Sequence, residues 1–311
     1  MSRFSALPLR TRLLGLFSQP MDYLPKAPDF LLKAVQRAGI HPVIERAVLG
    51  KSLPLPKVRQ QQVDTPHGPV DVRLYYPSTA ENLPVILFFH AGGWVIGNLE
   101  THDVMCRRLA TMTGALVISV DYHLSPWVKF PVPVEQGEAV LAWLRRDAVS
   151  LGADPLRVMV MGDSAGGNLS AVLARKHPKA LKAQVLVYPA TDGDFRSLSA
   201  DENSTAPILS KRLMQFFYDC YARTEEDKRH PDFSPLLAHD LTGLPPCLII
   251  TAEYDVLRDD GFAYAQRLQA AGVTVQHEHY ADIHGFLSFP TLCASGEEAF
   301  AAIGRFVGKV L

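Results

Sequence analysis

The segment Gly162 to Gly166, with the sequence GDSAG, carries the strongest chemical signal in this 311-residue chain. It follows the apolar run RVMVM and precedes a helical pattern that begins near Ala165. A tight strand-to-helix turn holds the central serine in a strained backbone conformation, and small residues on either side let neighbouring backbone pass close by. The N-terminus of the following helix favours negative charge that develops there. The pattern predicts Ser164 as a nucleophile for acyl transfer.

A second segment, HAGGW at residues 90–94, offers groups that such a reaction needs. A tetrahedral intermediate carries an oxyanion, and a glycine-rich turn can direct successive backbone N–H groups towards it. Gly92 and Gly93 are the predicted donors, joined by the N–H of Ala165. Taken alone, the turn also suits a phosphate-binding loop or a plain tight turn. We interpret His90 as part of the turn's structure rather than as a base.

An orienting acid is expected after a late strand, and the run CLIITAEYD places Asp255 just beyond one. Glu253 is a rival because it lies nearer the end of the strand. Asp259 and Asp260 are rivals as well, although their position at the start of the next helical pattern suits capping residues better. Asp255 is the predicted acid.

The base is expected last, because the chain order in α/β-hydrolases is serine, acid, histidine. That order leaves His277, His279 and His284 of the 11 histidines. His277 and His279 stand two residues apart in a strand pattern and so share one face, whereas His284 precedes Gly285 in the loop that follows. His284 is therefore the predicted base.

Short apolar runs alternate with helical patterns along most of the chain, which predicts a mostly parallel sheet covered on both faces. The first two expected strands alternate in character and suit an antiparallel edge, whereas the next five are nearly continuous apolar runs, as in strands buried on both faces. The expected strands are 58–64, 70–76, 84–89, 115–120, 157–161, 184–188, 247–251 and 273–280, and helical stripes are expected over 134–144, 169–173, 262–268 and 300–311.

Two regions fall outside this alternation. Residues 1–50 contain a helical pattern from Phe30 to Ala38, and residues 193–238 contain a run whose apolar residues cover too wide an arc for one simple core face. Both are interpreted as additions over a catalytic core of residues 51–192 and 239–311. No internal repeat or low-complexity linker marks a second independent domain.

Composition excludes several classes of protein. The chain has 31 basic and 32 acidic side chains, so no net field recruits nucleic acid or an anionic membrane. No apolar stretch approaches the length of a spanning helix, and the N-terminus lacks the features of a signal peptide. The cysteines form no metal-binding or disulfide pattern and are expected to be buried thiols in the cytoplasm; they are Cys106, Cys220, Cys247 and Cys293.

The segments HAGGW, DYHLSPWVKFP, GDSAGGN, LVYPATD, TAEYDVLRDDG and IHGF, in this order, resemble the hormone-sensitive lipase family of esterases, in particular its bacterial GDSAG branch. The likeness spans roughly residue 58 to the C-terminus. It implies an eight-stranded, mostly parallel sheet, and a helical cap built from the N-terminal segment and an insertion after the sixth strand. It also implies hydrolysis of short to medium acyl esters with neither metal nor cofactor.

Carried over residue by residue, the family's nucleophile, acid and base fall on Ser164, Asp255 and His284. Its oxyanion donors fall on Gly92, Gly93 and Ala165. Two departures stand out. The family usually writes HGGG where this chain has HAGG, so the hole survives only if the turn tolerates the methyl group of Ala91. The family also usually has an acidic residue and a histidine where this chain has Trp127 and Val128, which puts salt bridging near that loop in doubt.

The sequence thus predicts a serine carboxylesterase that acts on a small-molecule ester through an acyl-enzyme. Amide, carbamate and lactone hydrolysis stay open because the triad does not choose the leaving group, and a non-catalytic ligand-binding homologue is a further alternative. Trp94, Leu209 and Phe216 are candidates to line an apolar acyl pocket. The oligomeric state is not readable, and a homodimer is one option.

Overall fold

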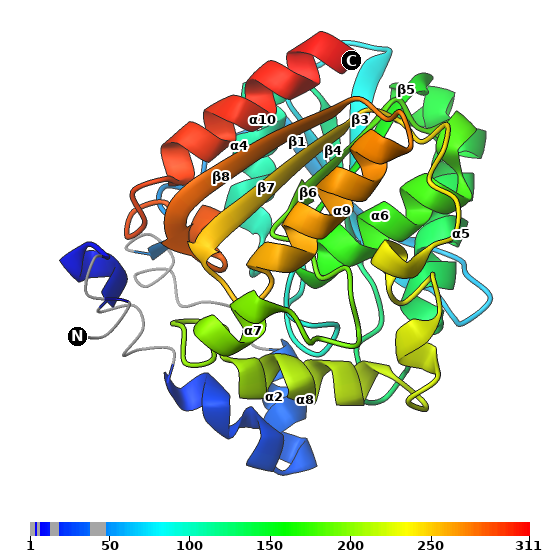
Figure 1. Cartoon of the computed structure of the whole chain (residues 1–311). Helices are drawn as coiled ribbons and strands as arrows, with labels where there is room; N and C mark the ends of the chain where they lie inside the picture. Colours follow the sequence, from blue (N-terminus) through cyan, green and yellow to red (C-terminus); the bar gives the residue numbers. More distant parts are fainter. Residues whose placement is uncertain (1–3, 5–6, 13–18, 38–47) are drawn as a thin grey trace.

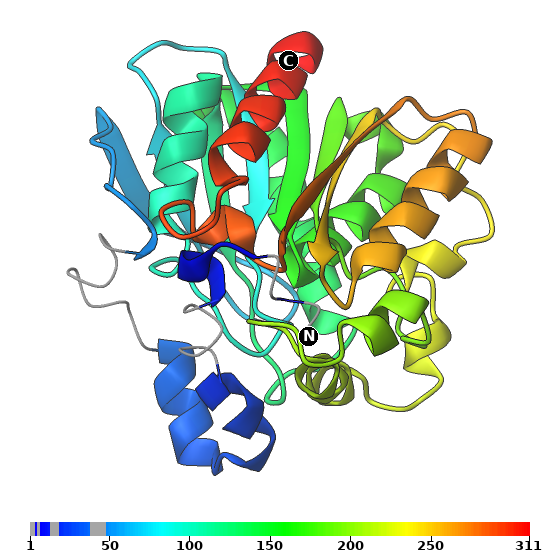
Figure 2. The same cartoon turned by 60° about the vertical axis from the view of Figure 1, so that its left-hand side comes forward.

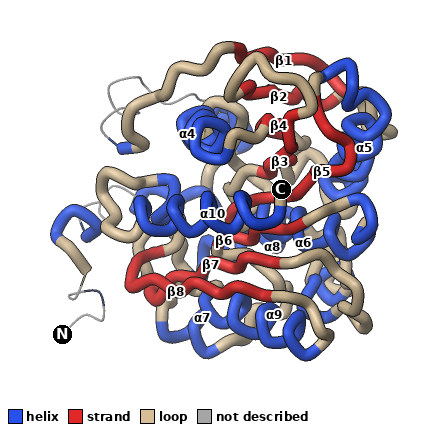
Figure 3. The backbone as a smooth tube through the Cα atoms, turned by 90° about the horizontal axis from the view of Figure 1, so that it is seen from above, coloured by secondary structure: helices blue, strands red, loops and turns tan. Residues whose placement is uncertain are grey.

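A computed structural model describes residues 4, 7–12, 19–37 and 48–311. Its centre is one eight-stranded sheet with the order β1-β2-β4-β3-β5-β6-β7-β8, seen edge-on in Figure 3. The strands are β1 (Lys57–Val63), β2 (Val70–Tyr76), β3 (Leu83–Phe89), β4 (Leu116–Asp121), β5 (Ala153–Asp163), β6 (Ala183–Val187), β7 (Cys247–Tyr254) and β8 (Val275–Ile283).

The expected antiparallel edge is confirmed, since β1 pairs with β2, and β2 with β4, in antiparallel register. All other pairs are parallel. Three strands extend beyond the predicted ranges by more than one residue: β5 begins at Ala153, β7 reaches Tyr254 and β8 reaches Ile283. The additional residues are more polar and hence lack the apolar run by which a strand is recognised.

The central parts of the inner strands are largely apolar because each face packs against helices. In β3, Val85, Leu87 and Phe89 belong to one core cluster. The intervening Ile86 and Phe88 belong to another cluster on the opposite face. Successive side chains of a strand point to opposite faces, so a sheet covered twice needs apolar residues at every position.

The helices form two layers around the sheet (Figures 1 and 3). Residues of α4 (Asp103–Thr113) and α10 (Gly296–Val310) share one core cluster. Residues of α5 (Val132–Asp147) and α6 (Ala165–Lys176) lie in a second cluster, and those of α9 (Arg258–Ala270) in a third. Shorter 3-10 turns are η3 (Ala148–Leu151), η4 (Pro178–Ala180), η5 (Asp227–Arg229), η6 (Pro235–Leu237) and η7 (Phe286–Ser288).

The sequence patterns missed helix α4. Its buried residues Met105, Cys106 and Leu109 are apolar, but two arginines interrupt the stripe. Both reach outward to acidic partners: Arg107 pairs with Asp103, and Arg108 with Glu297 of α10. Long cationic side chains that leave a buried face in this way weaken a periodicity argument.

The described helices of the two regions outside the alternation lie beyond the carboxyl ends of the parallel strands (Figures 1 and 2). The N-terminal part contains η2 (Gln19–Lys26) and α2 (Asp29–Arg37), and the later insertion contains α7 (Leu198–Glu202) and α8 (Lys211–Tyr221). The pattern predicted for Phe30 to Ala38 coincides with α2, except for Ala38, which lies outside the described residues. Residues 1–3, 5–6, 13–18 and 38–47 of the expected N-terminal addition also lie outside them.

Helix α8 explains the wide apolar arc in the insertion. Leu213, Phe217 and Tyr221 are buried, and Phe216 and Cys220 are half-buried and also pack against the core cluster. The expectation of four buried thiols is therefore wrong for Cys220, while Cys106, Cys247 and Cys293 are buried. Among the helices of the described residues, none combines the length and the apolar character needed to cross a bilayer.

Candidate active site

Ser164 stands between the last residue of β5 and the first residue of α6. Its backbone has φ 56° and ψ −115°, a conformation that costs a non-glycine residue energy. Two flanking glycines permit the turn, because a Cβ on Gly166 would collide with the carbonyl group of Phe89, and one on Gly162 with the carbonyl group of Gly166. The N–H of Ser164 donates to Val187 O at 2.8 Å, which ties the turn to β6.

The three predicted triad side chains lie in hydrogen-bond contact. His284 Nε2 is 3.0 Å from Ser164 Oγ, and His284 Nδ1 is 2.7 Å from Asp255 Oδ2. Because an ionised carboxylate only accepts, Nδ1–H must donate to Asp255, which leaves Nε2 to accept from the serine hydroxyl. Their exposed fractions are 5% for Ser164, 4% for His284 and 0% for Asp255. The arrangement can move a proton from serine to histidine in a site shielded from water.

Asp255 is held by several further contacts. Its second carboxylate oxygen, Oδ1, accepts the N–H of Leu257 at 2.8 Å. The side chain of Asn203, at the end of α7, donates to the backbone oxygen of Asp255 at 2.9 Å. The carboxylate is therefore oriented by its own turn, and a residue of the insertion holds the backbone of that turn.

The rival acids have other partners. Glu253 accepts from His279 at 3.2 Å and from Arg258 at 3.3 Å. Asp259 and Asp260 were expected to cap a helix, and this expectation is wrong: residue Leu257 precedes α9 and no side-chain cap bond is formed. Asp259 accepts instead from Ser199 N, and Asp260 from two backbone N–H groups, those of Thr191 and Asp192.

The rival bases form a network of their own. His277 Nε2 and His279 Nδ1 each lie 2.9 Å from Thr251 Oγ1. They share one face of β8, as their spacing predicts, and Phe262 packs on both rings. His284, by contrast, follows the last residue of β8 directly.

The predicted oxyanion turn has the backbone that its glycines require. Gly92 has φ 120° and Gly93 φ 60°, and a Cβ on Gly92 would collide with the carbonyl group of Ile96. Ala91 is not among the residues with positive φ, so its methyl group is tolerated. Within the described part of the chain, the N–H groups of Gly92, Gly93 and Ala165 donate to no protein acceptor, which leaves them available to an oxyanion.

His90 stabilises this turn through buried contacts. It is fully buried and stacks on Tyr122, with ring centroids 4.3 Å apart. Its Nδ1 lies 2.7 Å from the carbonyl oxygen of Ala91, and Tyr122 donates its hydroxyl to the carbonyl oxygen of His90. Burial lowers the pKa of His90 to about 3, so the ring stays neutral.

Two side chains of the insertion that the sequence analysis missed lie against the site. A Cβ on Gly93 would collide with the ring of Phe217, so this ring rests on the oxyanion turn. Ile208 Cγ2 lies 3.5 Å from the position of a Cβ on Gly285, next to His284. Ile208 also has φ 69°, which is strained for a β-branched residue. The packing of α8 against the site selects Phe217, and Ile208 lies in a turn outside regular structure. Hydrophobic periodicity therefore gives no signal for either residue.

The sequence-predicted pocket residues occupy neighbouring positions. Leu209 is buried in the core cluster next to Ile208, and half-buried Phe216 packs against Phe217 with ring centroids 5.9 Å apart. Trp94 is fully buried and stacks on Tyr221 of α8 at 4.4 Å and 6°. That face of the indole is occupied by protein and is not available to an acyl chain. A substrate role for these three side chains stays a prediction.

Helix α2 is tied to the oxyanion turn by one side chain. Gln36 Nε2 donates to Val95 O at 2.8 Å and to Ser125 O at 2.9 Å. Trp127 donates to Gln36 Oε1 at 2.9 Å, and Lys33 Nζ lies 4.2 Å from the centre of the indole ring. Where the family usually has charged side chains, this chain thus uses a hydrogen bond and a cation–π contact.

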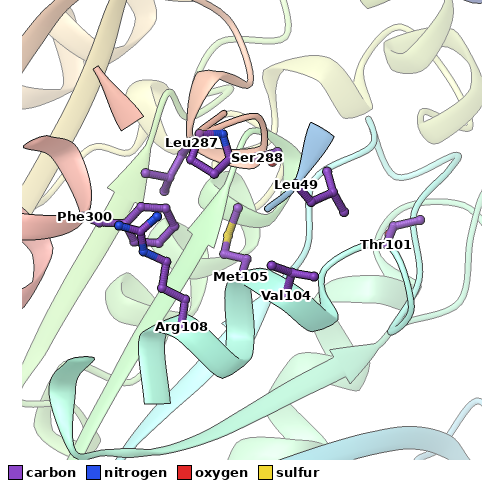
Figure 4. A pocket seen from close by; sticks show the side chains of 9 residues that line it. Leu49, Thr101, Val104, Met105, Arg108, Leu287, Ser288 and Phe300 are labelled. Carbon is purple, nitrogen blue, oxygen red and sulfur yellow. The ribbon is translucent and has the colours of Figure 1, made fainter. Parts of the chain in front are cut away.

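A small pocket lies on the α4 and α10 side of the sheet (Figure 4). Leu287 and Ser288 of η7 line it, close in sequence to His284, but no triad residue does. The pocket therefore adjoins the loop that follows β8 and carries His284, here called the histidine loop, and it is separate from the site of Ser164. Its other lining residues are Leu49, Thr101, Val104, Met105, Arg108, Pro290 and Phe300.

Known proteins share this sequence and architecture. A family model described as "alpha/beta hydrolase fold" matches residues 86–288. Carboxylesterase NlhH of Mycobacterium tuberculosis is 41% identical over 239 residues, which cover 74% of this chain and 75% of that protein. Esterase LipI of the same organism is 36% identical over 278 residues, or 86% of this chain and 83% of LipI.

A solved structure, the hyperthermophilic esterase from the archaeon Pyrobaculum calidifontis, superposes with a TM-score of 0.89 at 35% identity. The match covers 96% of this chain and 97% of that one. The sheet order, the serine turn and the sequence matches lead to one assignment. The chain belongs to the α/β-hydrolase family, among the esterases that resemble hormone-sensitive lipase.

Proposed function

We propose that this protein is a serine carboxylesterase with Ser164 as nucleophile, His284 as general base and acid, and Asp255 as the residue that orients the imidazole. The observation that carries the proposal is the chain of two hydrogen bonds from Asp255 through His284 to Ser164, with all three side chains buried. The names of the related proteins, carboxylesterase and esterase, support the same reaction class.

In the first half of the reaction, His284 Nε2 takes the proton of Ser164 while Oγ attacks the ester carbonyl carbon. The N–H groups of Gly92, Gly93 and Ala165 would hold the oxyanion, and the N-terminus of α6 adds a favourable dipole. His284 then returns the proton to the leaving alcohol. Water repeats the sequence on the acyl-enzyme and releases the acid.

We infer that the insertion of residues 193–238 and the N-terminal helices together form a cap over this site. Phe217 and Ile208 lie against the oxyanion turn and the histidine loop, and Gln36 ties α2 to the same turn. Apolar side chains at these positions favour acyl groups of short to medium length. The site residues include no metal ligand set, since no cluster suited to a metal ion occurs among the described residues. The chemistry proposed here needs none.

The test is a panel of p-nitrophenyl esters of increasing acyl length, run beside matched anilides, carbamates and lactones. We expect kcat/KM to be highest for a short or medium acyl ester and at least 100-fold lower for the anilide of the same acid. An anilide, carbamate or lactone hydrolysed faster than every ester would transfer the proposal to that class of substrate.

The ring of Phe217 is expected to limit the length of the acyl group. Phe217→Ala removes the ring that rests on Gly93, so space opens beside the oxyanion turn. Each additional methylene buried there adds roughly 0.8 kcal/mol, or about fourfold in kcat/KM. The profile of kcat/KM against acyl length should shift towards longer esters in the same panel.

Gln215→Ala is the matched control, because this exposed side chain comes from the same helix and donates to Asp219 at 3.0 Å. It should leave the position of the maximum unchanged. Equal shifts in both variants would mean that the helix as a whole, and not the ring on Gly93, sets the preference.

A further inference from the structure

A second histidine–carboxylate pair lies behind the nucleophile and plays no part in the reaction described above. Asp163 immediately precedes Ser164 and has an exposed fraction of 0%, and His102 precedes α4 and has 7%. Asp163 Oδ2 and His102 Nε2 are 3.6 Å apart. Among the described residues, neither carboxylate oxygen of Asp163 has a hydrogen-bond partner, and His102 Nε2 has none either.

The tautomer of His102 follows from its other nitrogen. His102 Nδ1 lies 2.9 Å from Thr101 Oγ1, and this hydroxyl donates its own hydrogen to Asn98 O at 2.9 Å. Thr101 Oγ1 can therefore only accept from the ring, so Nδ1 carries a hydrogen. The atom that faces Asp163 is Nε2, whose proton is the variable one.

The pair is stable only with one proton between its two groups. A bare Nε2 would direct a lone pair at an ionised, fully buried carboxylate, and a buried charge without a partner is costly. If Nε2 is protonated, the two charges compensate each other. If the proton resides on Asp163 instead, both groups are neutral, and the net charge of the pair is zero in either case.

Among the described residues, no cation other than His102 lies within salt-bridge distance of the Asp163 carboxylate. Burial lowers the pKa of His90 to about 3, and its ring centroid is 5.5 Å from that of His102. Asp121 lies 4.0 Å from His90 Nε2, and burial raises its pKa to about 6. At neutral and alkaline pH these two groups thus contribute a neutral ring and a further negative charge.

The neighbouring thiol and phenol groups are kept neutral by burial. Burial raises the pKa of Cys106 in α4, and it also raises the pKa of the hydroxyl groups of Tyr122 and Tyr188. Asp103, also in α4, is paired with Arg73 and with a second arginine. These neighbours supply no unpaired cation that could compensate a charge on Asp163.

We propose that His102 and Asp163 are a positioning pair that shares one proton, and that this proton keeps the serine turn free of net negative charge. The inference rests on the proposed role of Ser164. Loss of the proton would leave a negative charge one residue from the nucleophile. That charge would oppose the ionisation of Ser164 and the oxyanion that forms in the turn.

The consequence is a fall of kcat at alkaline pH, the alkaline limb of the pH profile, which the triad alone does not produce. His284 only needs to be neutral, so a triad alone gives a rate that rises with pH and then stays level. We expect kcat of the wild-type protein to fall again at alkaline pH, with KM changed by less than kcat.

Asp163→Asn removes the charge and keeps the shape of the side chain. We expect kcat at pH 7 to fall by no more than about tenfold and the alkaline limb to disappear. His102→Gln leaves Asp163 without its partner, so kcat at pH 7 should fall further, on the order of 10- to 100-fold, and the limb should move. The double variant should recover part of the loss of His102→Gln, because the unpaired charge is gone.

Rates are measured on the full chain in a pH-stat with Ser164→Ala as the blank, and circular dichroism verifies that each variant is folded at each pH. Glu138→Gln is the matched control, since Glu138 forms a half-exposed pair with His177 at 2.7 Å. It should leave the profile unchanged. Any one folded pair variant decides the question: an alkaline limb identical to that of the wild type overturns the shared proton. Activity that survives in the blank would instead overturn the role of Ser164, so the two failures are distinguishable.

Discussion

Ser164→Ala should lower kcat for ester hydrolysis by roughly 10⁵- to 10⁶-fold while the melting temperature stays close to that of the wild type. Among the described residues, the Ser164 hydroxyl is the only nucleophile in hydrogen-bond contact with His284 Nε2, at 3.0 Å. The remaining rate would come from the oxyanion turn and substrate binding. Steady-state kinetics on the preferred p-nitrophenyl ester measures the loss. Near-normal turnover in a folded variant would show that another residue is the nucleophile.

Ser164→Gly serves as the companion variant, because it separates catalysis from backbone strain. Glycine adopts φ 56° without the cost that serine has there, whereas alanine retains it. Both variants should be inactive, but the glycine variant should unfold at a higher temperature than the alanine variant. Calorimetry on the two proteins tests this order. A lower melting temperature for the glycine variant would mean that the turn carries no net strain.

Asp255→Asn should lower kcat by about 10⁴-fold with the fold intact. Two N–H donors converge on this carboxylate, His284 Nδ1–H on Oδ2 and the N–H of Leu257 on Oδ1. An amide has one oxygen, so in either orientation its NH₂ group faces one of these donors. The N–H of Leu257 cannot become an acceptor, whereas Nδ1 can, so the amide oxygen faces Leu257 and the NH₂ group faces His284. The imidazole then adopts the tautomer in which Nε2 carries the hydrogen and cannot accept the serine proton. Stopped-flow kinetics of acylation measures this step directly.

Glu253→Gln is the control for this prediction. Its carboxylate bonds to His279 and Arg258 and lies outside the chain of contacts to the serine. We expect a change in kcat of less than about tenfold, since the variant alters only a peripheral ion pair. If this variant lost more activity than Asp255→Asn, the role of the orienting acid would pass to Glu253.

The sheet and the serine turn were predictable because their causes are local. Continuous apolar runs such as Val85 to Phe89 require burial on both faces, and only parallel strands between two helical layers provide it. The turn at Ser164 needs two glycines at fixed spacing, which is visible in five consecutive letters. For the same reason, the position of Gly92 and Gly93 in a turn after a strand could be predicted.

The tertiary structure decided everything that depends on residues far apart in the sequence. Glu253 and Asp255 are both acids near the end of one strand, and only the directions in which β7 and the following turn place them separate the two roles. Phe217 rather than Phe216 rests on Gly93 because the rotation of α8 against the sheet selects the residue. Periodicity cannot fix that rotation when the apolar arc of the helix is wide enough to include both rings.

Asp163 and His102 illustrate the same limit most clearly. The aspartate occupies the variable position of the G-x-S-x-G motif, and the histidine precedes a helix that the sequence patterns missed. Neither residue type signals a partner by its spacing. Their proximity arises because β5 lies beside β3 in the sheet and α4 packs against the adjoining face. Local sequence thus determined which residues could react, and the packing of distant segments determined which side chains surround them and with what charge.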